Sequence, residues 1–401
     1  MIHHYSTQIF RFYPKTSLSN NYKTTIYTSM ANFSPPGPKI ASFQDEKKLQ
    51  AVFLAKNPRP FLKGFLAGSV LTLAVAGTAA YYYYWEDIQN RFKQQRAFEI
   101  LKYGVPTRPP PIMYYANHVL AYDSMRKTPI WVAEHLTKKS TEGFANRKRC
   151  RFQPDPKLKE TCFTASNDDF WNSGWSRGHM APAGNNKHNQ VAMDETFYLT
   201  NVVPQDIENN SGFWNRFEIY CRELTKRYKD VRLISGPLYM SRSEGNRKYV
   251  QYEVIGENNV AVPTHLYKIV VAENPHDSRK FVGAFVIPNA PISYEQSLTE
   301  FQVPLKALEK ETGIKFMKKL DRYKVQDLCQ VDGCRLLGKT DFQKYFLSRK
   351  LENTSTLKRL EKVWKEIEQY GLKKDQNLSK IYKDKKQLLM EHRPESERFY
   401  C

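Results

Sequence analysis

Acidic residues are scarce in this chain of 401 residues, which has 41 Asp and Glu against 62 Lys and Arg and a formal net charge of +21. An excess of this size is a poor match for acidic protein substrates alone. It fits a polyanion, meaning nucleic acid or an anionic membrane surface. A basic leader combined with generally solvated lysines is the plainer explanation of the same charge.

Cysteine is also sparse, and its spacing contains neither a Cys-x-x-Cys pair nor a zinc-type quartet. Cys329 and Cys334 enclose four residues, a spacing that leaves both a metal pair and a disulfide open. The remaining cysteines are interpreted as buried or idle thiols. The chain has no internal repeat, and a repeat architecture is therefore not expected.

The first forty residues, from Met1 to Ile40, contain no Asp or Glu, while basic side chains are scattered among Ser, Thr, Asn and Tyr. An acid-free, hydroxyl-rich leader is typical of a mitochondrial presequence. A disordered tail without an address is the alternative. We expect a targeting or disordered leader over residues 1–60.

A run without any charged residue follows from Gly64 to Trp85. At 1.5 Å per helical residue it is long enough to cross a hydrocarbon core of about 30 Å. The aromatic residues at its end, Tyr81 to Trp85, suit a membrane interface. A secretory signal is the main competitor, but the run lies far from Met1. We predict a single transmembrane anchor over 64–85, with basic residues before it favouring an N-terminus on the inner side.

Beyond a stiff linker at Pro106–Pro111, the sequence becomes globular. Alternating apolar segments predict strands, and the spacing of Phe213, Phe217, Tyr220, Cys221 and Leu224 predicts an amphipathic helix. The fold class expected over residues 103–335 is α+β, with a central antiparallel sheet flanked by helices. The segments expected as strands are 113–116, 130–133, 231–234, 250–254, 266–271 and 282–287.

A basic helical appendage is expected over residues 340–395. Leu357, Leu360, Trp364 and Ile367 form an apolar stripe, with Ser355 or Thr356 expected to cap its start and Gly371 to end it. A second helical stretch runs through 378–389 amid many lysines. The appendage either packs against the main domain or acts as a nucleic-acid clamp.

The stretch Gly174 to Pro182 (GWSRGHMAP) places Arg177 and His179 two residues apart. We expect His179 at the end of a strand, followed by a strand over Glu195–Asn201 that is broken at Pro204–Gln205. A helix then starts at Asn210. A hairpin folded onto that helix would bring the histidine and the asparagines together.

This arrangement suits phosphodiester hydrolysis, which needs a base, a cation and a proton donor. His179 is the candidate base. Asn210 offers one neutral oxygen to Mg²⁺, a cation that often keeps most of its water. Arg177 has the fork geometry for a phosphate. Glu218, two helical turns beyond Asn210, is expected to accept hydrogen bonds from water on the metal, and Asn201 to orient His179 or a water.

The motifs SRGHMAPAGNN and FYLTNVVPQDIENNSGFWNRFE resemble those of the DNA/RNA non-specific endonuclease family, in particular its mitochondrial endonuclease G group. The resemblance extends from about Tyr103 into the helical tail. It implies a ββα-metal nuclease fold, with the ββα-metal finger at 175–225. His179 falls on the family's general base and Asn210 on its only protein ligand for Mg²⁺ or Mn²⁺. Arg177, Asn201 and Glu218 fall on supporting positions.

One residue departs from the wider family, which mostly has Asp where this chain has Ser176. Ser is what the exonuclease-type branch of the group carries, so Ser176 marks that branch and favours 5′ chain ends. The helical tail resembles that branch's "wing". The resemblance also implies 5′-phosphate and 3′-hydroxyl products, a homodimer, and the mitochondrial inner membrane with the nuclease domain facing the intermembrane space.

Two other classes stay open. A membrane-tethered nucleic-acid-binding protein that has lost catalysis would explain the charge, but the presence of His179, Asn210 and Glu218 argues against decay. An inner-membrane scaffold explains the anchor and charge but not the polar constellation. For the nuclease and for the binding protein alike, DNA or RNA is expected to be bound mainly through phosphates, because no base-reading helix is evident.

Overall fold

The structure is a computed structural model that describes residues 58–105, 112–158, 163–274, 276–277, 279–373 and 375–391, with residues 58–64 described by their backbone alone. The expected leader before residue 58 and the linker Pro106–Pro111 lie outside these ranges. From Tyr84 onward the chain forms one compact unit, and the residues before Tyr84 belong to a separate one.

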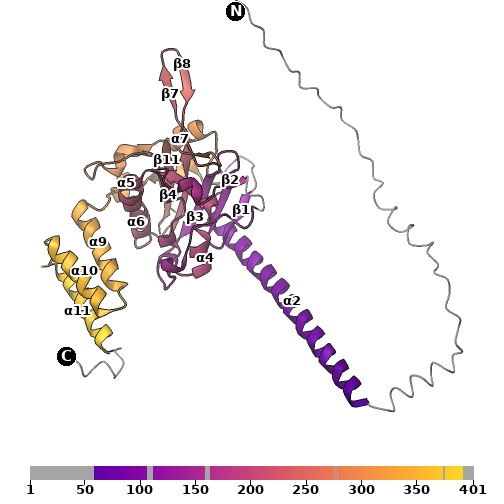
Figure 1. The fold of residues 1–401 in the computed structure, drawn as a ribbon. Helices are drawn as coiled ribbons and strands as arrows, with labels where there is room; N and C mark the ends of the chain where they lie inside the picture. The colour runs from indigo at the N-terminus through magenta and orange to yellow at the C-terminus, as the bar shows by residue number, and fades with distance from the viewer. Residues whose placement is uncertain are drawn as a thin grey trace, which may run out of the picture. The chain divides into compact units, whose positions relative to one another are not determined.

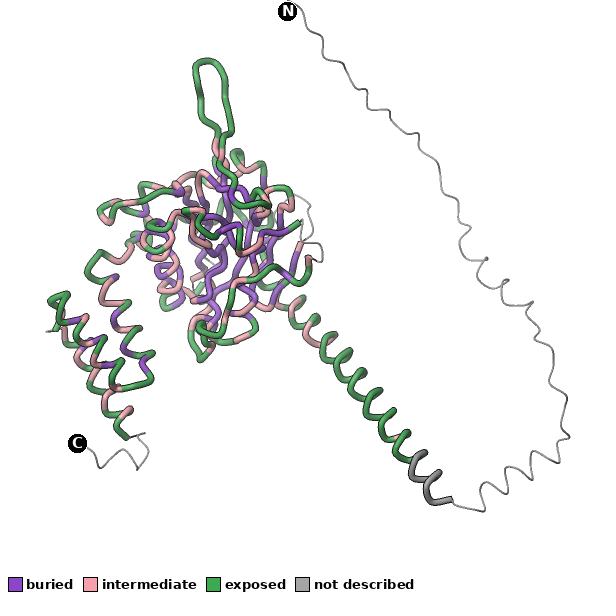
Figure 2. The backbone as a smooth tube through the Cα atoms, in the orientation of Figure 1, coloured by how far each residue is buried: buried purple, intermediate pink, exposed green. Residues whose placement is uncertain are grey.

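A long helix, α2 (Pro58–Ile100), contains the charge-free run. Its stretch from Phe65 is long and apolar enough to cross a membrane, and its apolar window is fully exposed (Figure 2). Exposed Leu and Val side chains at this density are unusual on a soluble surface. The helix therefore fits the predicted anchor, although it begins six residues before Gly64.

The compact unit is built on a central sheet (Figure 1), which is antiparallel except for one parallel strand at its edge. Its strand order is β1-β2-β3-β6-β11-β12-β13, and β14 pairs with β12 in parallel. These strands are β1 (Ile112–Tyr114), β2 (His118–Asp123), β3 (Thr128–Leu136), β6 (Asp230–Leu238), β11 (His265–Glu273), β12 (Lys280–Pro288), β13 (Gln302–Val303) and β14 (Val325–Asp327). The class is thus the expected α+β fold.

Helices cover both faces of this sheet. On one face α6 (Asn215–Leu224) buries Phe217 and Leu224 against alternate residues of β11 and β12. On the opposite face the end of α2 and helix α7 (Leu305–Thr312) contribute Ile100 and Leu308 to a second core. Alternation along β11 explains this division, because Val270 faces the first core and Val271 the second.

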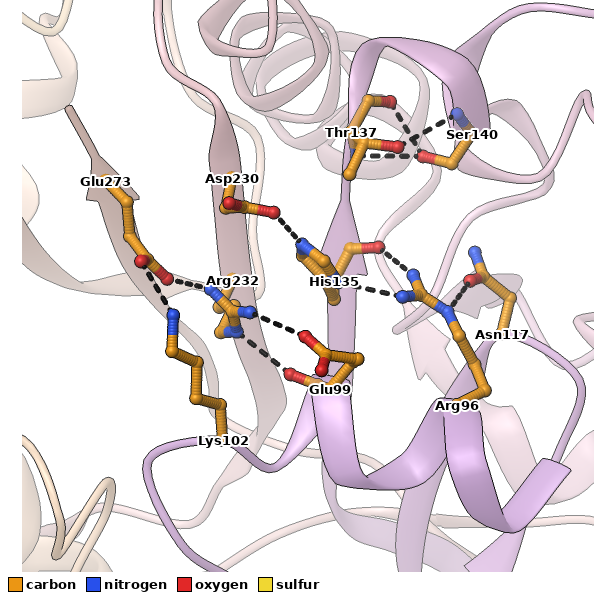
Figure 3. Close-up of polar contacts among 10 residues, drawn as sticks. All are labelled: Arg96, Glu99, Lys102, Asn117, His135, Thr137, Ser140, Asp230, Arg232 and Glu273. Atoms are coloured by element: carbon orange, nitrogen blue, oxygen red, sulfur yellow. Dashed lines mark hydrogen bonds and ion pairs between the residues drawn. The ribbon is translucent and has the colours of Figure 1, made fainter. Parts of the chain in front are cut away.

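A buried polar network fastens the end of α2 to the sheet (Figure 3). Arg96 donates to Asn117 Oδ1 at 2.8 Å and to the backbone oxygen of His135 at 2.6 Å, and it contacts His135 Nδ1 at 2.8 Å. A guanidinium can only donate, so Nδ1 is unprotonated and Nε2 carries the proton toward Asp230 at 2.5 Å. Burial lowers the pKa of His135 to about 4, and the cations of Arg232 and Arg96 add to this effect.

Three helices, α9 (Lys339–Glu352), α10 (Leu357–Gln369) and α11 (Gln376–Glu391), form the C-terminal appendage. They have a core of their own, made of Leu347, Leu351, Leu360, Val363, Ile367 and Leu378. The predicted start of α10 is confirmed, because Thr356 caps it by accepting from the Arg359 amide at 3.3 Å. Arg216 of α6 donates to the Leu337 carbonyl at 2.6 Å, just before the appendage, and the Phe342 ring of α9 lies 6.2 Å from the Tyr294 ring of the main unit.

The remaining elements include a protruding hairpin of β7 (Ser241–Glu244) and β8 (Arg247–Val250), which is exposed throughout (Figure 2). The strand expected at 250–254 is wrong: β8 ends at Val250, and only the short strand β9 (Val254–Ile255) follows, paired with β10 (Val260–Ala261). Cys329 and Cys334 form a disulfide, which settles the choice left open above. It lies at α8 (Leu328–Asp332).

Candidate active site

A small hairpin and a helix carry the residues singled out in the sequence. The hairpin consists of β4 (Ser176–His179) and β5 (Val202–Gln205), in which Ser176 pairs with Gln205 and His179 with Val202. Gly178 is required at this point, because a Cβ there would collide with the buried Gln205 side chain. The chain then continues directly into the helix, giving the ββα order that the sequence predicts.

Three local expectations are wrong. Glu195–Asn201 is not a strand: α4 (Gln190–Glu195) ends there and a 3₁₀ turn, Leu199–Asn201, follows. Pro204 and Gln205 do not break the element but lie within β5. The helix also starts earlier than Asn210, because Asp206 caps α5 (Ile207–Asn209) by accepting from the Asn209 amide.

Asn210 begins a π-helical turn, Asn210–Trp214, that leads into α6. Its side-chain Nδ2 lies 2.9 Å from Ser176 Oγ, and that hydroxyl lies 2.7 Å from the Gln205 carbonyl oxygen. A carbonyl can only accept, so the Ser176 proton is committed to Gln205. Ser176 Oγ must then accept from Asn210. The amide orientation follows: the NH₂ group faces Ser176, and Oδ1 is left for another partner.

With Oδ1 of Asn210 facing away from Ser176, a hard cation could bind this one oxygen without a cage of protein side chains. Among the described residues, no group of three or more His, Cys, Asp or Glu is arranged to hold a metal ion. Mg²⁺ gives up water reluctantly and usually takes few protein ligands. Asn210 Oδ1 is the oxygen that would serve as such a ligand.

His179 is buried, with 8% of its surface exposed, and it packs between the rings of Phe152 and Phe197 at centroid distances of 5.0 and 4.9 Å. Its Nε2 is buried with no hydrogen-bond partner among the described residues. Burial lowers the pKa of His179 to about 3, and the cation of Arg147 contributes. The imidazole is therefore neutral, which is the form that can accept a proton.

Arg177 shares one face of β4 with His179. Its guanidinium lies 5.4 Å from the centres of both Phe152 and Phe170 and donates to the Asn167 carbonyl at 3.1 Å. The Nε is buried without a partner among the described residues. Arg177 therefore keeps donor capacity for an anion beside His179.

Asn201 acts on the backbone. Its Oδ1 accepts from the Ala181 amide at 2.9 Å, and its Nδ2 donates to the carbonyls of Ala181 and Thr196 at 2.9 and 2.8 Å. Both amide protons are used in this way. Asn201 thus holds the segment that follows His179 rather than offering a free donor to a water.

Glu218 lies on α6 and is half-buried. Burial raises its pKa, whereas Arg222, Lys268 and Arg147 lower it. Arg147 acts on both Glu218 and His179, so these two side chains lie within the field of one guanidinium.

Four further residues complete the surroundings of Glu218 and were missed in the sequence. Arg222 donates to Asn185 Oδ1 at 3.0 Å, and the amide of Asn185 donates to Glu134 at 3.0 Å. Glu134 is 1% exposed and its Oε2 has no partner among the described residues. Burial raises the pKa of Glu134 to about 7.

Lys268, which is fully buried, donates to Ser235 Oγ at 2.5 Å and lies 4.5 Å from the Trp214 ring centre. Each of these residues had a signal in the sequence. Glu134 and Lys268 are single charges inside apolar strands, and Arg222 lies one helical turn after Glu218.

The chain is also similar to known proteins in sequence and in fold. Residues 96–323 match the family described as DNA/RNA non-specific endonuclease. The chain is 46% identical to zebrafish (Danio rerio) mitochondrial nuclease EXOG, over 81% of this chain and 94% of the relative, and 44% identical to the human protein over 82% and 92%. A solved structure titled as the EndoG/EndoGI complex superposes with a TM-score of 0.56 at 38% identity, covering 58% of this chain and 98% of that one.

Proposed function

Because the chain belongs to the DNA/RNA non-specific endonuclease family, we propose that it is a Mg²⁺- or Mn²⁺-dependent nuclease that hydrolyses phosphodiester bonds in DNA, and in RNA, with little sequence selectivity. One observation carries the proposal: β4 holds both His179 and Ser176. His179 is neutral and its Nε2 has no hydrogen-bond partner among the described residues, while Ser176 accepts from the Asn210 amide and so leaves Asn210 Oδ1 for another partner. Products with a 5′-phosphate and a 3′-hydroxyl complete the proposal.

In this mechanism the neutral imidazole of His179 takes the proton from the attacking water, and the guanidinium of Arg177 donates to the phosphate. Asn201 keeps His179 in place through the Ala181 backbone. A cation held by Asn210 would neutralise charge on the phosphate and stabilise the departing oxygen. Glu218 would accept hydrogen bonds from water around that cation, and Arg222 and Asn185 hold its surroundings.

The wing, residues 340–395 in our domain division, adds a preference for chain ends in this proposal. Lys and Arg outnumber Asp and Glu by fourteen to eight across residues 339–391. A separately packed, basic three-helix unit that follows soon after Leu337, whose carbonyl Arg216 holds, is suited to phosphate contacts. We therefore favour a 5′-exonuclease that retains endonuclease activity.

We further propose that the protein is mitochondrial and anchored by α2 in the inner membrane, with the nuclease domain in the intermembrane space and the enzyme acting as a homodimer. The acid-free leader, the apolar helix and the relatives named as mitochondrial nucleases support the location. The disulfide Cys329–Cys334 fits a compartment more oxidising than the cytosol.

The test uses the full chain in detergent, with a closed circular plasmid, a 5′-labelled linear duplex and a 5′-labelled single strand, in Mg²⁺ or in EDTA. His179→Ala should lower turnover by roughly 10²-fold or more while binding persists. His276→Ala, at an exposed histidine, serves as the matched control.

Short 5′ products with the circle intact would establish the exonuclease, and rapid nicking of the circle the endonuclease. Binding without Mg²⁺-dependent cutting by the wild type would instead favour the membrane-tethered binding protein. Normal cutting by His179→Ala would show that His179 is not the base.

A further inference from the structure

Trp171 is the most exposed tryptophan among the described residues, with 75% of its surface accessible. Tryptophan carries more apolar surface than any other side chain and is usually well covered. Isolated exposed apolar residues are common on protein surfaces and need no explanation by themselves. What distinguishes Trp171 is the segment that presents it.

That segment, Ser166–Trp175, is tightly held on both sides of Trp171. Before it, the buried carboxylate of Asp169 accepts from the backbone amides of Ser166 at 2.6 Å and Asn258 at 3.1 Å. After it, the Trp175 indole donates to Glu253 at 3.1 Å. The indole of Trp171 is therefore presented on a fixed support, and little backbone entropy remains to be lost when a ligand binds it.

The same segment lies against the candidate phosphate site. Phe170, the neighbour of Trp171 in sequence, is 5% exposed and its ring centre lies 5.4 Å from the Arg177 guanidinium carbon. Consecutive Cα atoms are about 3.8 Å apart, so the backbone of Trp171 adjoins that of a residue in contact with Arg177. The turn continues through Asn172, whose φ of 54° lies in the left-handed region and sends the chain back toward β4.

The charge beside Trp171 indicates which part of a nucleotide meets it. Asp168 is exposed and lies three residues before Trp171. Its carboxylate would repel a phosphate at this end of the segment, while Arg177 attracts one at the other. An indole three residues after an exposed carboxylate suits a neutral base better than a phosphate.

We propose that Trp171 is a stacking platform for an unpaired base of the nucleic-acid substrate, placed next to the nucleotide whose phosphate Arg177 holds. This inference rests on the proposed nuclease function and adds a preference for single strands and frayed ends. Stacking needs an open base face, so a fully paired blunt duplex gains nothing from Trp171 except where its end frays.

The experiment measures binding by the full chain in detergent, in a His179→Ala background that prevents cleavage. The ligands are a 5′-labelled single strand, a duplex with a single-stranded 5′ end, and a covalently closed circle. Trp171→Ala should weaken binding to the first two by roughly 5- to 100-fold, and binding to the circle by less than about twofold. Trp171→Phe should retain most of the affinity.

Two readouts separate stacking from a loss of structure or of charge. A 2-aminopurine base in the strand should be quenched on binding to the parent and to Trp171→Phe, but not to Trp171→Ala. The slope of log affinity against log salt should be unchanged by Trp171→Ala, because no phosphate contact is removed. Tyr323→Ala, at a fully exposed tyrosine elsewhere on the unit, is the matched control and should bind as the parent does.

Unchanged binding or unchanged quenching in Trp171→Ala would overturn the inference, as would an equal loss for all three ligands. A parent that binds none of the ligands would refute the proposed function itself, so the two failures are distinguishable.

Discussion

The hydroxyl of Ser176 offers the sharpest test of how the site is organised. With its proton committed to the Gln205 carbonyl, it dictates that Asn210 presents its oxygen, not its NH₂ group, to a cation. In Ser176→Ala the amide loses this acceptor, and the flipped orientation is no longer penalised. A cation would then compete with an amide that turns its donor side outward.

The expected loss can be worked from these two contacts. One net hydrogen bond contributes about 1 kcal/mol, and the flipped amide in the wild type would also place two acceptors against each other. Outer contacts that orient a metal ligand typically change metal affinity by about 10- to 100-fold when they are removed. We therefore expect Ser176→Ala to bind Mn²⁺ roughly 10- to 100-fold more weakly, with turnover at saturating metal nearly restored.

The assay is a titration of the full chain with Mn²⁺ in detergent, in which free Mn²⁺ is followed by electron paramagnetic resonance without any substrate. Ser176→Asp restores an acceptor for Asn210 and should bind Mn²⁺ more tightly than Ser176→Ala does. Ser241→Ala, on the exposed hairpin, controls for loss of a serine hydroxyl. Wild-type Mn²⁺ affinity in Ser176→Ala would refute the orientation argument.

Two further predictions concern stability. Burial lowers the pKa of His118 to about 3, and both ring nitrogens lack partners among the described residues. Because His118 takes up a proton below about pH 6.5 in the unfolded chain but not in the native state, the native state loses stability as the pH falls below about 6.5. The wild type should therefore lose about 1.4 kcal/mol more than His118→Gln between pH 7.5 and 5.5 in chemical denaturation, and equal losses would contradict this. Arg232, 2% exposed and bonded to Glu273 and to the Glu99 carbonyl, joins α2 to the sheet. Arg232→Ala should lower the free energy of unfolding by about 3–5 kcal/mol, with Arg232→Lys intermediate, and a loss under about 1 kcal/mol in the same measurement would argue against the network.

The segments that depart from the sequence-based predictions do so for a common physical reason. Glu195–Asn201 resembles a strand in sequence, yet its residues form turns. The Leu199 amide donates to the distant Gln153 carbonyl, and the Thr196 carbonyl accepts from the nearby Asn201 side chain. Proline at 204 usually marks a break, but β5 tolerates it within a two-stranded hairpin. Local pattern cannot reveal either outcome.

The sequence by itself determined the class of the fold, the amphipathic helix under the site, the apolar helix α2 and the motif around His179 and Asn210. Each of these can be recognised from short stretches of consecutive residues, in which periodicity and spacing are visible. Only the tertiary structure decided which way the Asn210 amide faces, that the Asn201 amide bonds backbone groups, and that the Trp171 side chain is exposed. These features depend on hydrogen bonds and contacts between residues tens of positions apart, and folding alone brings such partners together.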